Sequence, residues 1–178
     1  GKELRGKTLG VIGFGRIGQE VAKRGIGLGM NILAHDKYNK EANITLNFFN
    51  GEKKTFTIET TDIKDVLKNS DFITLHVPKV DDKAIIGAEE IGMMKTGSGI
   101  INTSRGGLVD ETALMFALDK EKISYAGLDV YENEPVPSIH LLMHGAISLT
   151  PHIGAATLEA QDRIGIELAD QIISFFQK

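Results

Sequence analysis

A glycine-rich loop near the start of the chain has the spacing of a phosphate-binding turn. In "TLGVIGFGRIGQE", Gly13, Gly15 and Gly18 follow an apolar run and open a helical pattern. In that setting the first glycine permits a tight turn, the second lets the backbone approach a pyrophosphate, and the third allows a helix to pack closely on a strand. Free amides at the helix start favour an anion. Taken alone, the loop could also be an incidental glycine-rich turn.

A carboxylate at the end of the next apolar run narrows the ligand class. Asp36 lies 18 residues after Gly18, where a carboxylate can accept both ribose hydroxyls of NAD and would repel the 2′-phosphate of NADP. The glycine loop and Asp36 together predict NAD as the cofactor. Arg16, inside the loop, either pairs with a cofactor phosphate or is a solvated arginine, and the sequence leaves both readings open.

An arginine ends another apolar run, in "GIINTSRGGLVDE". In open parallel sheets, ligands bind beyond the carboxyl ends of the strands, so Arg105 is expected to point toward the same crevice. The planar guanidinium group suits a substrate carboxylate. The alternative is an ion pair between Arg105 and a surface acid.

Two further strand ends carry acidic and imidazole groups. "AGLDVYENEPVP" presents Asp129, Glu132 and Glu134, any of which could simply be solvated, and "SLTPHIGAAT" puts His152 directly after Pro151. Proline ends the strand, which fixes the histidine at its carboxyl end. The ordinary pKa of an imidazole, about 6.5, suits proton transfer near neutral pH. His152 is therefore the candidate acid-base.

The elements that must position these residues alternate between short apolar runs and helical patterns. This alternation predicts an α/β fold with a doubly wound parallel sheet, of the Rossmann dinucleotide-binding type. Strands are expected over residues 8–12, 31–35, 72–76, 99–102, 124–128 and 146–149. Helices are expected over residues 16–28, 62–69, 110–120 (capped by Asp110) and 155–176, the last with Ile164, Leu168, Ile172 and Phe175 on one face.

One stretch, residues 44–61, interrupts this rhythm. "ITLNFFNGEKKTFTIETT" holds two alternating β-rich runs around Asn50-Gly51, the dipeptide that suits a type I′ hairpin turn. We therefore predict an antiparallel β-hairpin inserted near residues 44–60. The alternative is an irregular connection whose alternation is accidental.

Composition limits the class of protein. The 178 residues, 42% of them hydrophobic, suffice for one buried domain, and the net charge of -4 comes without a basic stripe. These features give no indication of binding to nucleic acid or membrane. The absence of cysteine excludes thiolate metal sites and a thiol nucleophile, and no metal site is predicted. A cytoplasmic location is the expectation.

Four blocks together resemble a known family. "GKTLGVIGFGRIG", "NTSRGGLVDE", "AGLDVYENEP" and "LTPHIGAAT" are similar, in order and spacing, to signature blocks of the D-isomer-specific 2-hydroxyacid dehydrogenases, most of all the phosphoglycerate dehydrogenase branch. The match runs from Gly6 to about Gln171. The resemblance implies oxidation of a D-2-hydroxy acid or reduction of its 2-keto partner, with 3-phosphoglycerate as first substrate and a place in serine biosynthesis.

The resemblance also implies roles for individual residues. Arg105 would bind the substrate carboxylate, Glu134 would hydrogen-bond His152, and His152 would be the acid-base. Asp129 would reach the nicotinamide side of the cofactor. Related formate dehydrogenases carry glutamine at the position of Glu134, so the carboxylate argues against that activity. The full expected cofactor-binding set is Gly13, Gly15, Arg16, Ile17, Gly18, Asp36, His76, Val77, Pro78, Thr103, Ser104, Arg105, Asp129, His152, Gly154 and Ala155.

The chain also departs from the family pattern. Family members build a substrate-binding lobe from segments on both sides of the cofactor domain, and residues 1–178 are expected to be a single cofactor domain without that lobe. On this reading the chain binds NAD but turns over poorly by itself. The family also implies a homodimer. Hydroxypyruvate or glyoxylate reduction is the nearest alternative activity, and an NAD-sensing, corepressor-like interaction module is the alternative outside enzymes.

Overall fold

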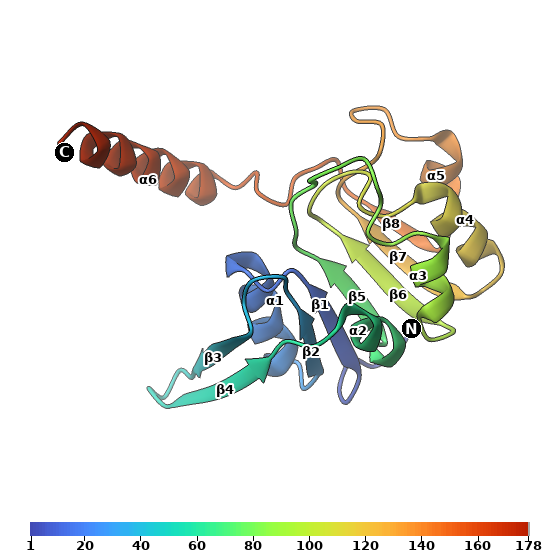
Figure 1. Ribbon diagram of the computed structural model, residues 1–178, viewed down its shortest axis with the longest axis horizontal. Helices are drawn as coiled ribbons and strands as arrows, with labels where there is room; N and C mark the ends of the chain where they lie inside the picture. Colours follow the sequence, from blue (N-terminus) through green and yellow to red (C-terminus); the bar gives the residue numbers. More distant parts are fainter. Residues whose placement is uncertain (178) are drawn as a thin grey trace.

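Six parallel strands form one sheet, in the order β2-β1-β5-β6-β7-β8, in the computed structural model, which describes residues 1–177 (Figure 1). Helices cover both faces, which confirms the predicted doubly wound α/β fold. The strands of this sheet are β1 (Thr8–Ile12), β2 (Asn31–His35), β5 (Phe72–Leu75), β6 (Ser98–Asn102), β7 (Ile123–Leu128) and β8 (Ile147–Leu149). The helices are α1 (Arg16–Gly27), α2 (Ile63–Asn69), α3 (Ala88–Met93), α4 (Glu111–Asp119), α5 (Ile139–Met143) and α6 (Leu158–Phe176).

The alternation of side chains along β1 explains why helices lie on both faces. Leu9 and Val11 are buried in a cluster with Ala22 of α1, whereas Ile12 is buried in the main core with Val66 of α2. Successive strand residues point to opposite faces, so one strand anchors two helices. The apolar spacing of the sequence therefore sets the layers.

The strand order reverses direction beside β1, and this point fixes where a ligand can sit. From β1 the chain crosses to β2 on one side, and it later returns to β5 on the other. The helices that follow β1 and β5 consequently leave in different directions and open a crevice at the carboxyl ends of these strands. The glycine loop directly follows β1, and His76 directly follows β5.

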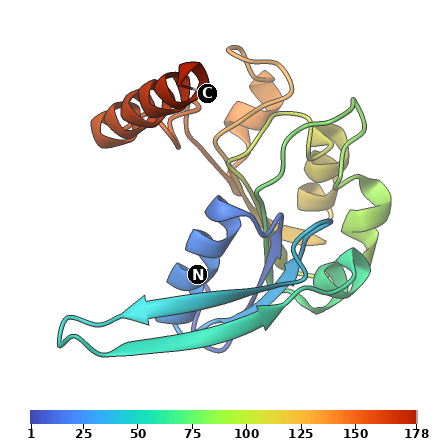
Figure 2. The ribbon, with the colours of Figure 1, turned by 60° about the vertical axis from the view of Figure 1, so that its left-hand side comes forward.

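The predicted hairpin is present, but its turn differs from the prediction. Strands β3 (Glu41–Asn47) and β4 (Lys53–Glu59) pair antiparallel and extend beyond the sheet beside α1 (Figure 2). A type I′ turn needs positive φ at both central residues, yet only Gly51 of this loop has one, at 86°. The Gly51 amide donates to the Phe48 carbonyl at 3.0 Å, as in three-residue loops that end in a left-handed glycine.

The helices show two further differences from the sequence prediction. The short helices α3 and α5 were not expected. The apolar stripe of α6 exists but is not buried: the helix projects from the body of the molecule (Figure 1), and Ile164, Leu168 and Ile172 are 60%, 54% and 50% exposed. The Asp110 cap is confirmed, since its side chain accepts a hydrogen bond from the Ala113 amide at 2.9 Å.

Candidate active site

The three glycines of the loop meet different surroundings. Gly13 has φ 93°, and a Cβ there would lie 2.4 Å from the His76 carbonyl oxygen; a Cβ on Gly18 would lie 2.0 Å from the Gly13 carbonyl oxygen. A Cβ on Gly15 would meet nothing within 4 Å. Gly13 and Gly18 are therefore required by internal packing, whereas Gly15 leaves open space beside the first turn of α1. This arrangement fits a phosphate-binding loop.

Asp36 directly follows β2 and contacts the backbone of the glycine loop. Its carboxylate accepts hydrogen bonds from the amides of Phe14, at 2.6 Å, and of Tyr38, at 2.8 Å. Partial burial acts to raise the pKa of Asp36, but the backbone amides of Asn39, Tyr38 and Phe14 outweigh it and hold the pKa below its usual value. The side chain is therefore an ionised acceptor beside the glycine loop.

A cleft of about 600 Å³ lies between these groups. His76, Val77 and Pro78 line it together with Gly13, Gly15 and Asp36, and so does His35. The remaining predicted cofactor residues do not line this cleft, and two of them are exposed at the start of α1. Arg16 is exposed and pairs with Glu167 of α6 at 3.5 Å, and Ile17 is 68% exposed.

The pKa of His76 depends on the burial of its side chain at the cleft wall. Burial lowers its pKa to about 4, and its Nε2 lies 3.0 Å from the Thr74 hydroxyl. Between pH 6.5 and 4 the unfolded chain therefore binds more protons at this residue than the folded chain, so the free energy of unfolding falls as the pH drops through that window. We expect His76 to contribute a loss of about 2 kcal/mol at pH 5 relative to pH 8.

Denaturant unfolding at several pH values checks this prediction. His76→Gln should unfold with a shallower pH dependence between pH 8 and 5 than the unaltered chain, because the glutamine does not titrate. His140→Gln, at an exposed position, is the matched control and should keep the original slope. Equal slopes for the unaltered chain and His76→Gln would show that His76 does not carry the effect.

His152 and Glu134 form a close pair at the other half of the sheet edge. His152 Nδ1 lies 2.7 Å from Glu134 Oε2, and the second carboxylate oxygen accepts the Tyr131 amide at 3.0 Å. The hydrogen bond with His152, followed by that from the Tyr131 amide, lowers the pKa of Glu134. An ionised Glu134 accepts a hydrogen bond from the Nδ1–H, which leaves Nε2 of the imidazole available for a reacting group.

The backbone around His152 is held in an uncommon conformation. His152 has φ 55°, in the left-handed region that non-glycine residues rarely adopt. Asp129, 3% exposed, accepts the amides of Ile153 and Gly154, both at 2.8 Å, and the hydroxyl of Thr150. These hydrogen bonds outweigh the opposing effect of burial, which is the largest single influence, and lower the pKa of Asp129. The buried carboxylate thus fastens the segment on both sides of His152.

Arg105 lies beyond the carboxyl end of β6. The Asn102 side-chain amide donates to its carbonyl at 2.9 Å, and its own guanidinium donates to the Ser104 carbonyl at 2.6 Å. The Ser104 hydroxyl donates to the Val77 carbonyl at 2.7 Å, which links this loop to the wall of the cofactor cleft. The guanidinium makes no ion pair among the described residues, so the expected alternative of a surface pair is not seen.

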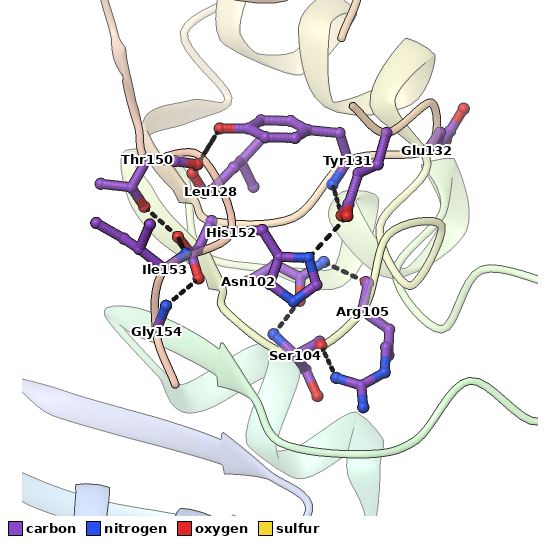
Figure 3. Close-up of polar contacts among 12 residues, drawn as sticks. Asn102, Ser104, Arg105, Leu128, Tyr131, Glu132, Thr150, His152, Ile153 and Gly154 are labelled. Carbon is purple, nitrogen blue, oxygen red and sulfur yellow. Dashed lines mark hydrogen bonds and ion pairs between the residues drawn. The ribbon is translucent and has the colours of Figure 1, made fainter. Parts of the chain in front are cut away.

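The structure thus gathers the predicted residues along one edge of the sheet, in two groups. Figure 3 shows the polar contacts of the second group, around Arg105 and His152. The glycine loop, Asp36 and His76 follow β1, β2 and β5, while Arg105, Glu134 and His152 follow β6, β7 and β8. Thr103 and Ala155 are exposed on the same loops. Sequence reasoning missed Asn102, Tyr131 and Thr150. The Tyr131 hydroxyl and the Thr150 side chain act through contacts between loops, which no local spacing could have indicated. Asn102 instead contacts Ser104 and Arg105 in its own loop, a turn contact typical of asparagine.

Two other features are not seen in the part of the chain that the structure describes. Within residues 1–177, no cluster of three or more histidine, aspartate or glutamate side chains is arranged to hold a metal ion. Among the helices of the same residues, none combines the length and the apolar character needed to cross a membrane.

The family follows from a comparison with known sequences. The profile described as "D-isomer specific 2-hydroxyacid dehydrogenase, NAD binding domain" matches residues 1–154. The chain belongs to this family. Membership in this dehydrogenase family confirms the resemblance found in the four sequence blocks, and it confirms NAD as the cofactor predicted from the glycine loop and Asp36.

Individual members of the dehydrogenase family support the assignment. A hydroxypyruvate reductase of Thermotoga maritima is 47% identical over 97% of the chain and 54% of that protein. A D-3-phosphoglycerate dehydrogenase of Methanocaldococcus jannaschii is 47% identical over 97% of the chain and 32% of that protein. The crystal structure of a glyoxylate reductase from Paecilomyes thermophila superposes with a TM-score of 0.85 at 36% identity, over 100% of this chain and 52% of that one. The chain thus spans about half or less of these relatives.

Proposed function

We propose that the chain is the cofactor-binding part of an NAD-dependent dehydrogenase that interconverts a D-2-hydroxy acid and its 2-keto acid. The observation that carries this proposal is the pair formed by His152 and Glu134, 2.7 Å apart, on the same sheet edge as the NAD cleft. Oxidation of a hydroxyl carbon requires a base for the hydroxyl proton beside a hydride acceptor. A cofactor cleft alone would serve many binding proteins, whereas the acid-base pair favours chemistry over binding alone.

In this mechanism the proton moves at Nε2 of His152. The Nδ1–H of His152 donates a hydrogen bond to Glu134, so the neutral ring presents the Nε2 lone pair to the substrate hydroxyl and takes its proton during oxidation. During reduction, the imidazolium returns the proton from Nε2 to the carbonyl oxygen. The ionised Glu134 stabilises the imidazolium in both directions. When bound, NAD supplies the acceptor for the substrate's C2 hydride, and NADH supplies the donor in reverse.

In the proposed mechanism, Arg105 binds the substrate. Its guanidinium group can hold a carboxylate through two parallel hydrogen bonds, and a bound carboxylate places the C2 oxygen toward the histidine. The positive charge also stabilises the partial negative charge on that oxygen. The carbonyl contact with Asn102 fixes the arginine loop but leaves the guanidinium fork able to turn toward substrate.

The residues that would hold NAD follow from the cleft geometry. The open space at Gly15 and the helix start are suited to the pyrophosphate, Asp36 to the ribose hydroxyls, and Val77 and Pro78 to the adenine. Asp129 and the loop residues Thr103, Ser104, Gly154 and Ala155 would serve the nicotinamide end. Arg16 and Ile17, which lie outside the cleft, would contact the phosphates only through a change of side-chain conformation.

The substrate proposed first is 3-phosphoglycerate, with hydroxypyruvate and glyoxylate as alternatives, since the similar proteins carry names of all three activities. A panel of the three substrate pairs, assayed with NAD and NADH on the full-length protein, tests this proposal. We expect turnover of one of the three acids and, where that acid is chiral, no turnover of its L isomer. Binding of NAD without turnover of any member would instead favour a nucleotide-sensing interaction module.

We further propose that a substrate-binding lobe completes the site in the full-length protein. His152 and Glu134 are 48% and 34% exposed, so these residues alone do not exclude water from the reaction. Helix α6 presents apolar side chains with none buried, a surface suited to packing against a further unit. We also propose that the full-length protein is a homodimer and is located in the cytoplasm.

A further inference from the structure

Tyr131 lies where the loops of the three candidate catalytic residues meet. It is 8% exposed, and its ring packs in the main core. The residue follows β7 between Asp129 and Glu134, and Figure 3 shows its polar groups directed toward neighbouring segments. Its amide contacts Glu134 in the same loop, while its hydroxyl and its carbonyl contact two other loops of the site.

The first contact is with the glutamate. The Tyr131 amide donates to Glu134 Oε1 at 3.0 Å, while Oε2 of the same carboxylate faces His152 Nδ1 at 2.7 Å. The amide therefore fixes the rotation of the carboxylate and presents its second oxygen to the imidazole. A hydrogen bond to an ionised acceptor is among the stronger kinds.

The second contact is with the segment that carries the histidine. The Tyr131 hydroxyl donates to the Thr150 carbonyl, which also accepts the His152 amide at 3.1 Å. Burial, followed by the nearby charge of Asp129, raises the pKa of the Tyr131 phenol. The hydroxyl consequently keeps its proton and remains a donor. One carbonyl thus ties the tyrosine to the backbone of His152.

The third contact is with the arginine loop. A Cβ on Gly106, the residue after Arg105, would lie 1.7 Å from the Tyr131 carbonyl oxygen. The absence of a side chain at Gly106 therefore allows this loop to rest directly on the backbone of Tyr131. The amide, hydroxyl and carbonyl of one residue contact the segments of Glu134, His152 and Arg105 respectively.

We infer that Tyr131 is a positioning residue that sets the geometry of the Glu134–His152 pair relative to the Arg105 loop. The inference rests on the proposed function for its catalytic consequence, but the geometric claim concerns the chain alone. A phenylalanine would fill the same core space without tying the Thr150 carbonyl. The hydroxyl therefore has a role beyond packing.

The test compares Tyr131→Phe with Tyr125→Phe, which removes the hydroxyl of a partly exposed tyrosine on β7. In the 178-residue chain, proton NMR should show a downfield resonance from the His152 Nδ1 proton, assigned by its loss in His152→Gln. We expect Tyr131→Phe to shift or broaden this resonance while Tyr125→Phe leaves it unchanged. An unaltered resonance in folded Tyr131→Phe would overturn the inference.

Turnover of the full-length protein gives a second readout. We expect Tyr131→Phe to lower kcat about five- to tenfold, the effect of one lost neutral hydrogen bond, with KM for NAD unchanged. If the protein shows no turnover at all, the proposed function fails, while the NMR comparison still decides the inference about Tyr131. A change in KM for NAD alone would also contradict the positioning role.

A measurement on the unaltered chain covers the case in which Tyr131→Phe does not fold. If Tyr131 ties the two loops together, the amides of Tyr131, Ile153 and Gly154 should exchange with deuterium at similar rates, because the segments open as one unit. Exchange of Ile153 and Gly154 that is orders of magnitude faster than that of Tyr131 would show that the loops open separately and would refute the inference.

Discussion

Replacing His152 with glutamine is expected to lower the rate of hydride transfer by the full-length protein by about 10²- to 10⁴-fold, the usual contribution of a positioned acid-base. Glutamine has no group that can exchange a proton near neutral pH. NAD binding should be retained, because the glycine loop and Asp36 are untouched. Steady-state kinetics and calorimetric titration with NAD measure the two effects separately.

Two further variants make this prediction specific. Glu134→Gln keeps a hydrogen-bond acceptor for Nδ1 but removes the charge, so its kcat should fall less than that of His152→Gln. His140→Gln alters an exposed histidine outside the site and should leave kcat unchanged. Full turnover by His152→Gln would refute the assignment of the acid-base while leaving the NAD site intact.

Gly13→Ala and Gly15→Ala lie two residues apart but should affect different properties: the first should lower stability and the second NAD affinity. At Gly13 the φ is 93°, and a Cβ would lie only 2.4 Å from the His76 carbonyl oxygen. That variant should lose about 3 kcal/mol in the free energy of unfolding. At Gly15 a methyl group meets nothing within 4 Å. The Gly15 variant should fold normally and lose NAD affinity, because the methyl group occupies the space suited to the pyrophosphate.

Denaturant unfolding and NAD titration of the 178-residue chain distinguish these outcomes. Gly92→Ala, in helix α3, also meets nothing within 4 Å and serves as the control for replacing a glycine by alanine. Normal NAD affinity in Gly15→Ala would contradict the proposed path of the cofactor. Normal stability in Gly13→Ala would contradict the packing of the loop against His76.

The fold was largely predictable because its signals are local. Apolar alternation located the strands, and the side chain of Asp110 identified the start of α4. The hairpin followed from two β-rich runs, but its turn did not, because Asn50-Gly51 is compatible with more than one loop. Asn47 pairs with Lys53, and the Phe48 amide donates to the Glu52 carbonyl at 2.9 Å, which leaves a loop of three residues. The register of the strands, rather than the dipeptide, selected the turn.

The candidate site was predictable only in part. Strand ends and family blocks located Arg105, Glu134 and His152, since parallel strands bring their carboxyl ends to one edge. The contacts that hold these residues join segments distant in sequence, such as Asp129 with Gly154 and Gly106 with Tyr131. Likewise, the apolar face of α6 was visible in the sequence, but periodicity shows only that a face exists and not what covers it.

We propose that hydride passes between C2 of a 2-hydroxy acid and NAD in the protein that contains this chain. Incubation of the full-length protein with NAD and D-3-phosphoglycerate, D-glycerate or glycolate deuterated at C2, followed by NMR of the reduced cofactor, measures this transfer directly. We expect deuterium at C4 of the nicotinamide with one of these acids and its near loss in His152→Gln. Absence of deuterium with all three, despite bound NAD, would contradict this proposal.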